Sequence, residues 1–235
     1  MLQAFRNFLT RRTFAYKARN KAMNMFSSFE NFKAIRKKAE DSRKDTNRPH
    51  EVLYFHKVDD PYSHLTIHFI EKFKSTYDVK FKSILVGEEN PAALHEPSLY
   101  TDYCLEDVKR IAPFYGVDFP GIDYPKKDLV NKANAILSAV SEEEFESIAK
   151  QVSHAIWSGD QEKLNSLGES YQTSEAEVIE KLKTGNEIRN NCDYYFGSAF
   201  YYEKELYWGL DRLPYLEERL TELCLLYTSP SPRDS

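Results

Sequence analysis

The fold of this chain is decided by the stretch Val52-Leu53-Tyr54-Phe55-His56-Lys57-Val58-Asp59-Asp60-Pro61-Tyr62-Ser63-His64-Leu65. Its first part is apolar and rich in β-branched and aromatic residues, which favours a strand. A charged turn follows, and Pro61 then suits the first position of a helix, where its missing N–H is not needed. The N–H groups of a helix's first turn are unpaired and carry partial positive charge. We therefore expect a strand, a turn and a helix to meet at Asp60, and the chemical site of the protein to lie there.

The residues that follow extend this pattern to a strand, a helix and a second strand. Apolar residues at helical spacing predict a helix over residues 61–77; they are Leu65, Phe69, Ile70 and Phe73. The alternation between Asp78 and Val86 predicts the second strand. A strand–helix–strand unit of this length is expected to be parallel and right-handed.

Residues 97–191 are expected to form an all-helical insertion between two halves of one fold. One helix is predicted to end near Gly116, and three more are predicted over residues 129–140, 141–158 and 174–191. Capping-box spacing marks two of their starts, in the pairs Ser141 with Glu144 and Ser174 with Glu177. Beyond them, residues 200–208 predict a tight hairpin. Asp211 is expected to cap a last helix that buries Leu213, Leu216 and Leu220.

Two motifs resemble those of a known family. Asp60-Pro61-Tyr62-Ser63 stands where DsbA-like thioredoxin-fold proteins have Cys-Pro-x-Cys, and it is similar to the Ser-Pro-Tyr of 2-hydroxychromene-2-carboxylate isomerases and kappa-class glutathione transferases. Residues 196–213, with Trp208-Gly209-Leu210-Asp211-Arg212-Leu213, resemble that family's closing hairpin and last helix. The resemblance covers about residues 51–223. It implies an α/β, thioredoxin-like fold with an all-helical insertion, preceded here by a basic helical arm.

The resemblance also implies which residues form the site. In the isomerases and kappa transferases a Ser at the place of Asp60 holds or activates the sulfur of glutathione, so Asp60 is the candidate catalytic residue, supported by Ser63 and His64. Asp211 matches an acidic residue that contacts the γ-glutamyl end of glutathione. The other candidate glutathione-binding residues are Pro61, Tyr62, Ser198 and Arg212.

Simpler roles remain open for these residues. Asp60 and Asp211 can each serve only as a helix N-cap. A carboxylate repels a thiolate, but it can act as a general base for a thiol or an acidic C–H. We expect His64 to lie within reach of Asp60, as an acid–base pair or a hydrogen bond. His64 and His68, at i and i+4, also have metal-binding spacing, but without a clear further ligand no metal is expected.

Two departures from the family pattern limit the chemistry. Disulfide exchange needs a thiolate at the helix start and a second thiol one turn later. Asp60 and Ser63 supply neither, which excludes thiol–disulfide exchange by these residues. Gly197-Ser198-Ala199 stands where the family has Gly-x-Pro-Thr, so a trans peptide is expected in place of a cis-proline.

Aromatic residues are abundant, and several tyrosines are predicted to line a cleft between the thioredoxin half and the helices. They are Tyr62, Tyr194, Tyr195, Tyr201, Tyr202 and Tyr207. Such a cleft would suit an aromatic substrate, although core packing is the commoner role of tyrosine rings.

Charge and cysteine content narrow the class of protein. Residues 1–48 hold 13 of the 32 Lys and Arg but 4 of the 37 Asp and Glu, so the remainder of the chain is strongly acidic. An acidic body argues against nucleic acid as the main partner. Cys104, Cys192 and Cys224 form no CxxC or zinc pattern, as expected in a reducing compartment. Without a long apolar run or a secretory signal we expect a cytoplasmic protein with no membrane span.

Both ends of the chain differ from its body. The basic residues 1–48 fit an arm that packs on an acidic surface of the same chain or of a partner, but also a transit peptide or a helix on an anionic surface. Residues 224–235 resemble a translated sequencing adapter, and a native disordered tail is the alternative. Some relatives carry two DsbA-like domains in tandem after a basic arm, so a missing second domain is expected.

Two functions are therefore considered. The first is a glutathione-linked isomerase or transferase that acts on a small aromatic or electrophilic substrate. The second is a domain without catalysis that binds a second DsbA-like domain or forms a homodimer.

Overall fold

A computed structural model describes residues 14–87 and 96–226 of the chain. The chain divides into two compact units, residues 1–49 and residues 50–235. The described part of the first unit contains helices α2 (Phe14–Phe26) and α3 (Phe29–Asp45). The Ser28 side chain accepts a hydrogen bond from the amide of Asn31 and so caps the start of α3.

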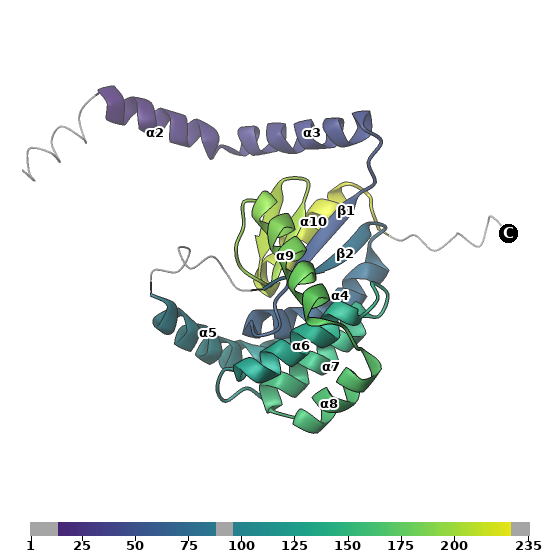
Figure 1. The fold of residues 1–235 in the computed structure, drawn as a ribbon. Coiled ribbons are helices and arrows are strands. Elements are labelled where there is room, and N and C mark those ends of the chain that lie inside the picture. Colours follow the sequence, from purple (N-terminus) through teal and green to yellow (C-terminus); the bar gives the residue numbers. More distant parts are fainter. Residues whose placement is uncertain (1–13, 88–95, 227–235) are drawn as a thin grey trace, which may run out of the picture. The chain divides into compact units, whose positions relative to one another are not determined.

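The second unit is built on a sheet with the strand order β2-β1-β3-β4 (Figure 1). Strand β1 (Glu51–His56) pairs in parallel with β2 (Lys80–Leu85) and antiparallel with β3 (Ala199–Tyr202). Strand β4 (Glu205–Trp208) pairs antiparallel with β3. Helix α4 (Pro61–Thr76) joins β1 to β2. The predicted strand–helix–strand unit and the closing hairpin are confirmed.

The segment between β2 and β3 is helical in its described part. Its elements are α5 (Pro97–Ile111), the 3₁₀ helix η2 (Ala112–Tyr115), α6 (Lys127–Ala139), α7 (Phe145–Ser158), α8 (Gln161–Ser170) and α9 (Glu175–Asn191). Helix α8 was not predicted, because it buries only two apolar side chains, Leu164 and Leu167, which make a weak periodic signal. Asp160 caps it by accepting from the amide of Lys163.

The two predicted capping boxes have different outcomes. Ser174 and Glu177 form the full box at the start of α9. Ser141 accepts from the amide of Glu144, but this contact closes a turn, and α7 begins only at Phe145. The prediction of a helix start at Ser141 is therefore wrong, because the same local bond also satisfies a turn.

The sheet is covered on both faces, because alternate residues of each strand point to opposite sides. One face packs on α4 and on the last helix, α10 (Leu213–Glu222); its buried residues include Val52, Tyr54, Phe200 and Tyr202. The other face carries Leu53, Phe55, Ile84 and Tyr201, which pack with Ile188 of α9 and with Cys192, the C-cap of that helix.

Helix α9 lies very close to β2. A Cβ atom on Gly185 would overlap the carbonyl oxygen of Leu85. Only glycine allows this approach of a helix to a strand backbone. Gly185 therefore allows α9 to pack directly against the backbone of β2.

The end of the described chain corrects one prediction. A 3₁₀ helix, η3 (Leu210–Arg212), precedes α10, and no side chain caps either helix. Asp211 is thus not the N-cap of α10, since it lies inside η3 and Arg212 occupies the N-cap position. Leu213, Leu216 and Leu220 are buried as predicted. Of the C-terminal segment, residues 227–235 lie outside the described residues, and the carbonyl of Leu225 accepts from the amide of Asp78 at 2.7 Å.

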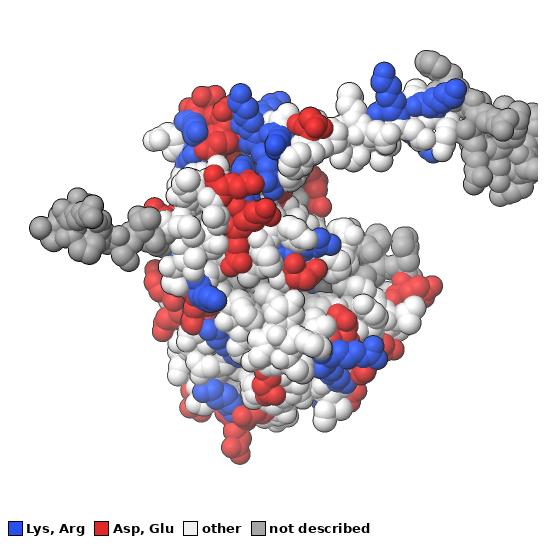
Figure 2. Space-filling model, turned by 180° about the vertical axis from the view of Figure 1, so that it is seen from behind, with Lys and Arg blue, Asp and Glu red and all other residues white. Residues whose placement is uncertain are grey.

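On the face of the second unit seen in Figure 2, Lys and Arg side chains lie beside Asp and Glu side chains. No extended basic patch, of the kind that nucleic acid binding needs, is visible on the described residues of that face. Among the helices within residues 14–87 and 96–226, none is long and apolar enough to cross a membrane.

Two histidines belong to the core. His64 of α4 is fully buried; its Nδ1 lies 2.9 Å from the Ser153 hydroxyl of α7 and its Nε2 lies 2.8 Å from the carbonyl oxygen of Asp118. Burial lowers the pKa of His64 to about 4 and that of His56, on β1, to about 3. Both rings are therefore neutral in the folded protein at pH 7.

These histidines make the protein sensitive to acid. The unfolded chain binds their protons first, near pH 6.5, so stability should fall from about pH 6.5 down to about pH 4 for His64, by up to about 1.4 kcal/mol per pH unit for each ring. We expect His64→Gln to flatten this pH dependence in chemical denaturation measured at several pH values. His154→Gln is the control, because that side chain is 53% exposed. Parallel stability curves for His64→Gln and the parent would contradict the prediction.

Candidate functional site

The candidate site lies at the junction of β1 and α4, where the sequence predicted it. Asp60 is the N-cap of α4: its Oδ1 accepts from the amide of Tyr62 at 3.2 Å and its Oδ2 from the amide of Ser63 at 3.0 Å. Pro61 occupies the first helical turn, as expected. The negative carboxylate therefore sits against the positive end of the helix dipole.

Ser63 ties the same carboxylate to β1. Its hydroxyl donates to Asp60 Oδ2 at 2.7 Å and accepts from the amide of Lys57 at 3.3 Å. Ser63 is buried, whereas Asp60 is half-buried. Ser63 thus holds and orients Asp60, since its hydroxyl both donates to the carboxylate and accepts from the Lys57 amide.

The loop before β3 covers this pair. A Cβ atom on Gly197 would lie 2.9 Å from Asp60 Oδ2 and 3.1 Å from Ser63 Oγ, so the backbone of Gly197 rests on the two side chains. The next residue, Ser198, is fully buried, and its hydroxyl bonds to that of Thr66 at 2.8 Å. The described residues contain no cis peptide bond, so the trans peptide expected at Ser198-Ala199 is confirmed. The carbonyl of Ser198 accepts from the amide of Gly209 at 2.7 Å, so the residue is bonded inside the core.

His64 does not pair with Asp60, contrary to the sequence expectation. Both of its ring nitrogens are bonded to the helical segment, at Ser153 and Asp118. His64 thus faces α7 and not Asp60. His68 does lie beside it, with the ring centroids 5.2 Å apart. No group of three or more His, Cys, Asp or Glu suited to a metal ion occurs within the part of the chain that the structure describes.

A small cavity of about 60 Å³ adjoins Asp60 and Pro61. It has room for a group the size of a thiol or a water molecule. Cys104 of α5 also lines it, but burial raises the pKa of that thiol to about 11. A neutral thiol is a poor nucleophile, so Cys104 does not replace the missing thiolate of the family motif.

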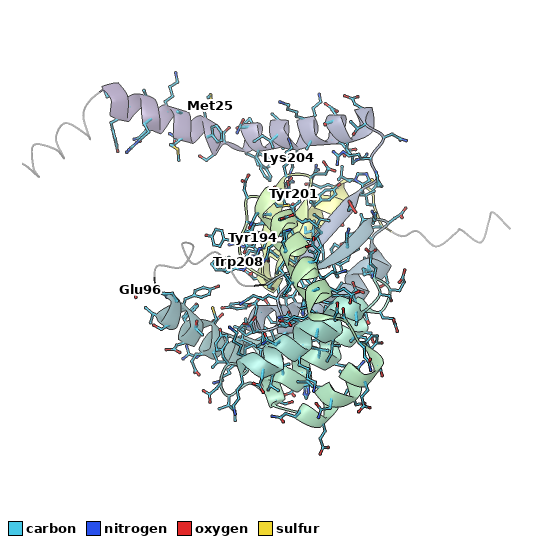
Figure 3. The ribbon with its side chains drawn as sticks, viewed as in Figure 1. Met25, Glu96, Tyr194, Tyr201, Lys204 and Trp208 are labelled. Carbon is cyan, nitrogen blue, oxygen red and sulfur yellow. The ribbon has the colours of Figure 1, made fainter. Side chains whose placement is uncertain are left out.

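Stacked aromatic rings form one wall of this cavity. Phe196, just before β3, stacks on Tyr100 of α5 with centroids 5.4 Å apart, and on Trp208 of β4 with centroids 5.2 Å apart. Figure 3 shows Trp208 on the side of the sheet towards Glu96, where α5 begins. Trp208 is 41% exposed, so part of its ring is open to a ligand.

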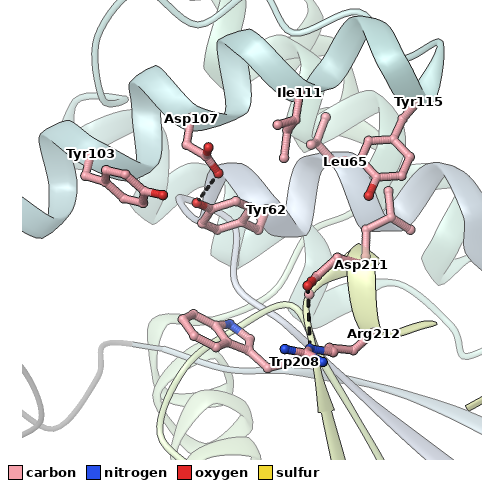
Figure 4. A pocket seen from close by; sticks show the side chains of 11 residues that line it. Tyr62, Leu65, Tyr103, Asp107, Ile111, Tyr115, Trp208, Asp211 and Arg212 are labelled. Atoms are coloured by element: carbon pink, nitrogen blue, oxygen red, sulfur yellow. Dashed lines mark hydrogen bonds and ion pairs between the residues drawn. The ribbon is translucent and has the colours of Figure 1, made fainter. Parts of the chain in front are cut away.

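Trp208 also lines a larger pocket of about 490 Å³ (Figure 4). Its walls come from α4, α5, η2 and the β4–η3 segment; the side chains that line it include Tyr62, Tyr103, Asp107, Tyr115, Trp208, Asp211 and Arg212. The Tyr62 hydroxyl donates to Asp107 at 2.7 Å, and burial together with this bond raises the pKa of Tyr62. Arg212 Nε lies 3.5 Å from the Asp211 carboxylate. The pocket thus combines aromatic walls with a charged pair at its rim.

The predicted residues therefore fall into three groups. Asp60 and Pro61 line the small cavity, and the buried Ser63 is bonded to Asp60, while Tyr62, Asp211 and Arg212 line the larger pocket. His64 and Ser198 are bonded inside the core. Their assigned roles in catalysis and binding remain predictions.

The predicted aromatic cleft is made largely from other residues. Tyr202 and Tyr207 are core residues, and of the tyrosines named from the sequence only Tyr62 lines either pocket. Sequence reasoning missed Tyr103 and Asp107, although Tyr103, Asp107 and Ile111 recur at helical spacing on one face of α5. The sequence pattern predicted a helix that ends near Gly116 but assigned no role to this face.

Comparisons with known proteins support the fold. No family model matches the chain, and no curated protein sequence matches it. Among solved structures, a 2-hydroxychromene-2-carboxylate isomerase aligns with a TM-score of 0.55 at 19% identity, over 74% of this chain and 96% of the isomerase. A protein from Nitrosomonas europaea, provisionally described as a protein disulfide isomerase, aligns with a TM-score of 0.54 at 12% identity, over 75% of this chain and 99% of that one. The chain thus has the DsbA-like thioredoxin fold that its two motifs predicted, the fold shared with the isomerase.

Proposed function

We propose that this protein is a glutathione-linked isomerase or transferase, similar to the 2-hydroxychromene-2-carboxylate isomerases and kappa-class transferases, that acts on a small aromatic or electrophilic compound. The observation that carries the proposal is the 490 Å³ pocket beside the start of α4, with aromatic walls and a charged pair at its rim. Its volume is in the range of small-molecule sites. Cytoplasmic, reducing conditions belong to this proposal, since they keep glutathione and the unpaired cysteines reduced.

Glutathione fits the charges of the pocket. Its γ-glutamyl end carries an ammonium and a carboxylate, which complement Asp211 and Arg212 at the rim. From there the tripeptide would pass Trp208, which lines both cavities, and bring its thiol into the small cavity at Asp60. The remaining part of the pocket, between Tyr62 and Tyr115, would hold the aromatic substrate.

Asp60 would act as an acceptor for the thiol proton. The amides of Tyr62 and Ser63 and the Ser63 hydroxyl donate to the carboxylate and stabilise its negative charge. Repulsion between two negative charges then favours a bound sulfur as S–H and not as a thiolate. As sulfur forms its bond to an electrophilic carbon, the proton passes to the carboxylate. In a transfer reaction the proton then leaves with the displaced group, whereas in an isomerisation it returns to the sulfur when the carbon–sulfur bond breaks again.

A second function is favoured by one observation. The Asp60 carboxylate and the Ser63 hydroxyl are bonded to each other and to backbone amides, and the backbone of Gly197 rests on both. Such a closed arrangement suits a purely structural cap. The alternative proposal is accordingly a non-catalytic domain that partners a second DsbA-like domain or a second copy of itself.

Glutathione binding tests the first proposal. Titration of glutathione into the full chain in a calorimeter should give saturable binding, and Asp211→Ala should weaken it at least tenfold, which equals about 1.4 kcal/mol. Asp78→Ala makes the same charge change at an exposed position after the far end of α4 and should bind like the parent. Absence of binding by the folded parent protein would overturn the proposal and leave the partner-domain function.

The role of Asp60 is tested by two substitutions. Asp60→Ala removes both cap and charge and should cost about 1 kcal/mol of stability, whereas Asp60→Asn keeps a good cap and should cost less. If Asp60 accepts the thiol proton, both variants should lose at least tenfold in the rate of glutathione addition to an activated chloronitrobenzene. A rate for Asp60→Asn equal to that of the parent would show that Asp60 is a cap only.

A further inference from the structure

The pocket of about 490 Å³ carries more negative than positive charge. Among the described residues that line it, Asp107 and Asp211 are carboxylates and Arg212 is the single cation. Arg212 Nε lies 3.5 Å from Asp211, so these two charges largely offset each other. The neutral Tyr62 hydroxyl donates to Asp107 but leaves its negative charge in place. The net charge of the described lining therefore comes from Asp107.

Aromatic rings surround this charge. Figure 4 shows Tyr62 and Tyr103 beside Asp107, with Trp208 on the other side of the opening. Tyr103 is 63% exposed, so its ring is open to a ligand and does not belong to the core. The face of an aromatic ring carries partial negative charge and attracts cations. Rings and a carboxylate in one pocket thus favour the same sign of ligand charge.

The two tyrosines next to the carboxylates stay neutral. Burial and the Asp107 contact raise the pKa of Tyr62, and burial and the Asp211 carboxylate raise that of Tyr115. A raised tyrosine pKa means that further negative charge is disfavoured at that position. An anionic ligand would meet the same penalty between these rings, whereas a cationic ligand would lower it.

We propose that the pocket takes an aromatic compound that carries a positive charge, such as an aryl-substituted ammonium. The charged group would lie at Asp107, against the rings of Tyr62 and Tyr103, and the aromatic part would extend towards Tyr115. An aromatic carboxylate of the same size would place its negative charge against Asp107 and bind poorly. This inference rests on the function proposed above, because it names the class of substrate that the pocket would hold beside glutathione.

Three probes of similar size and different charge test the proposal. At pH 7 benzylamine is a cation, benzyl alcohol is neutral and benzoate is an anion. Added to the ¹⁵N-labelled full chain, benzylamine should give saturable shifts of the Trp208 indole N–H signal, assigned with Trp208→Phe. It should bind about tenfold more tightly than either of the other two probes. Equal binding of all three, tighter binding of benzoate, or no shift at tens of millimolar benzylamine would overturn the proposal.

Asp107→Asn separates the charge of this residue from its shape. Asparagine has nearly the same size and still accepts from the Tyr62 hydroxyl, so the variant should weaken benzylamine severalfold and change benzyl alcohol little. The matched control is Asp102→Asn, which removes the same charge from an exposed position of α5 that does not line the pocket. The control should bind benzylamine like the parent. Equal weakening in both variants would show attraction by a generally acidic surface and would overturn the proposal.

The ring of Tyr103 is tested separately. Tyr103→Leu keeps an apolar side chain but removes the ring face, so it should weaken benzylamine severalfold and leave benzyl alcohol nearly unchanged. Equal loss of both probes would show that Tyr103 supplies only apolar contact and would contradict its role in charge selection.

These titrations contain no glutathione, so their outcome is separate from that of the glutathione titration. A chain that binds glutathione but does not prefer benzylamine overturns the cation assignment and leaves the proposed function standing. A chain that prefers benzylamine but does not bind glutathione supports the cation site and overturns the glutathione-linked function.

Discussion

The hydrogen bonds that converge on the Asp60 carboxylate hold this site together. They tie the first turn of α4 to Lys57, the residue after β1, through Ser63, and the backbone of Gly197 covers them from the loop before β3. Two parts of the chain that are distant in sequence, residues 57–63 and the loop at Gly197, thus meet at one charged group. A thiol at this position could accept hydrogen bonds only weakly. With a carboxylate in place of the thiol, the site cannot carry out disulfide exchange, but the start of α4 is held more strongly. Any reaction at this position must use a negative charge that is fixed in place.

The fold could be predicted where local patterns decide it. The strand at Val52, the helix at Pro61 and the hairpin before Trp208 each follow from periodicity and turn residues, and two short motifs identified the thioredoxin-like class. Local reasoning was less accurate where one pattern suits two structures. Ser141 and Glu144 make the contact that a capping box requires, yet they close a turn ahead of α7.

The site could be predicted only in part, for a different reason. Asp60, Ser63 and Pro61 are neighbours in sequence, so their meeting follows from one helix start. The environment of His64 depends on Ser153 and Asp118, which lie on the helical insertion, and no local pattern reveals them. The aromatic wall made by Tyr100, Phe196 and Trp208 likewise joins three segments that only the complete fold brings together.

The position of β1 in the sheet has a consequence for folding kinetics. Its two neighbours in the sheet are β2, which follows after one helix, and β3, which begins only at Ala199. During synthesis the edge formed by Leu53 and Phe55 therefore stays open while the whole helical segment is made. Pairing over such a long separation slows folding, and an open strand edge invites association with other chains. The length of the helical segment between β2 and β3 thus determines how long the edge of β1 stays exposed to other chains during synthesis.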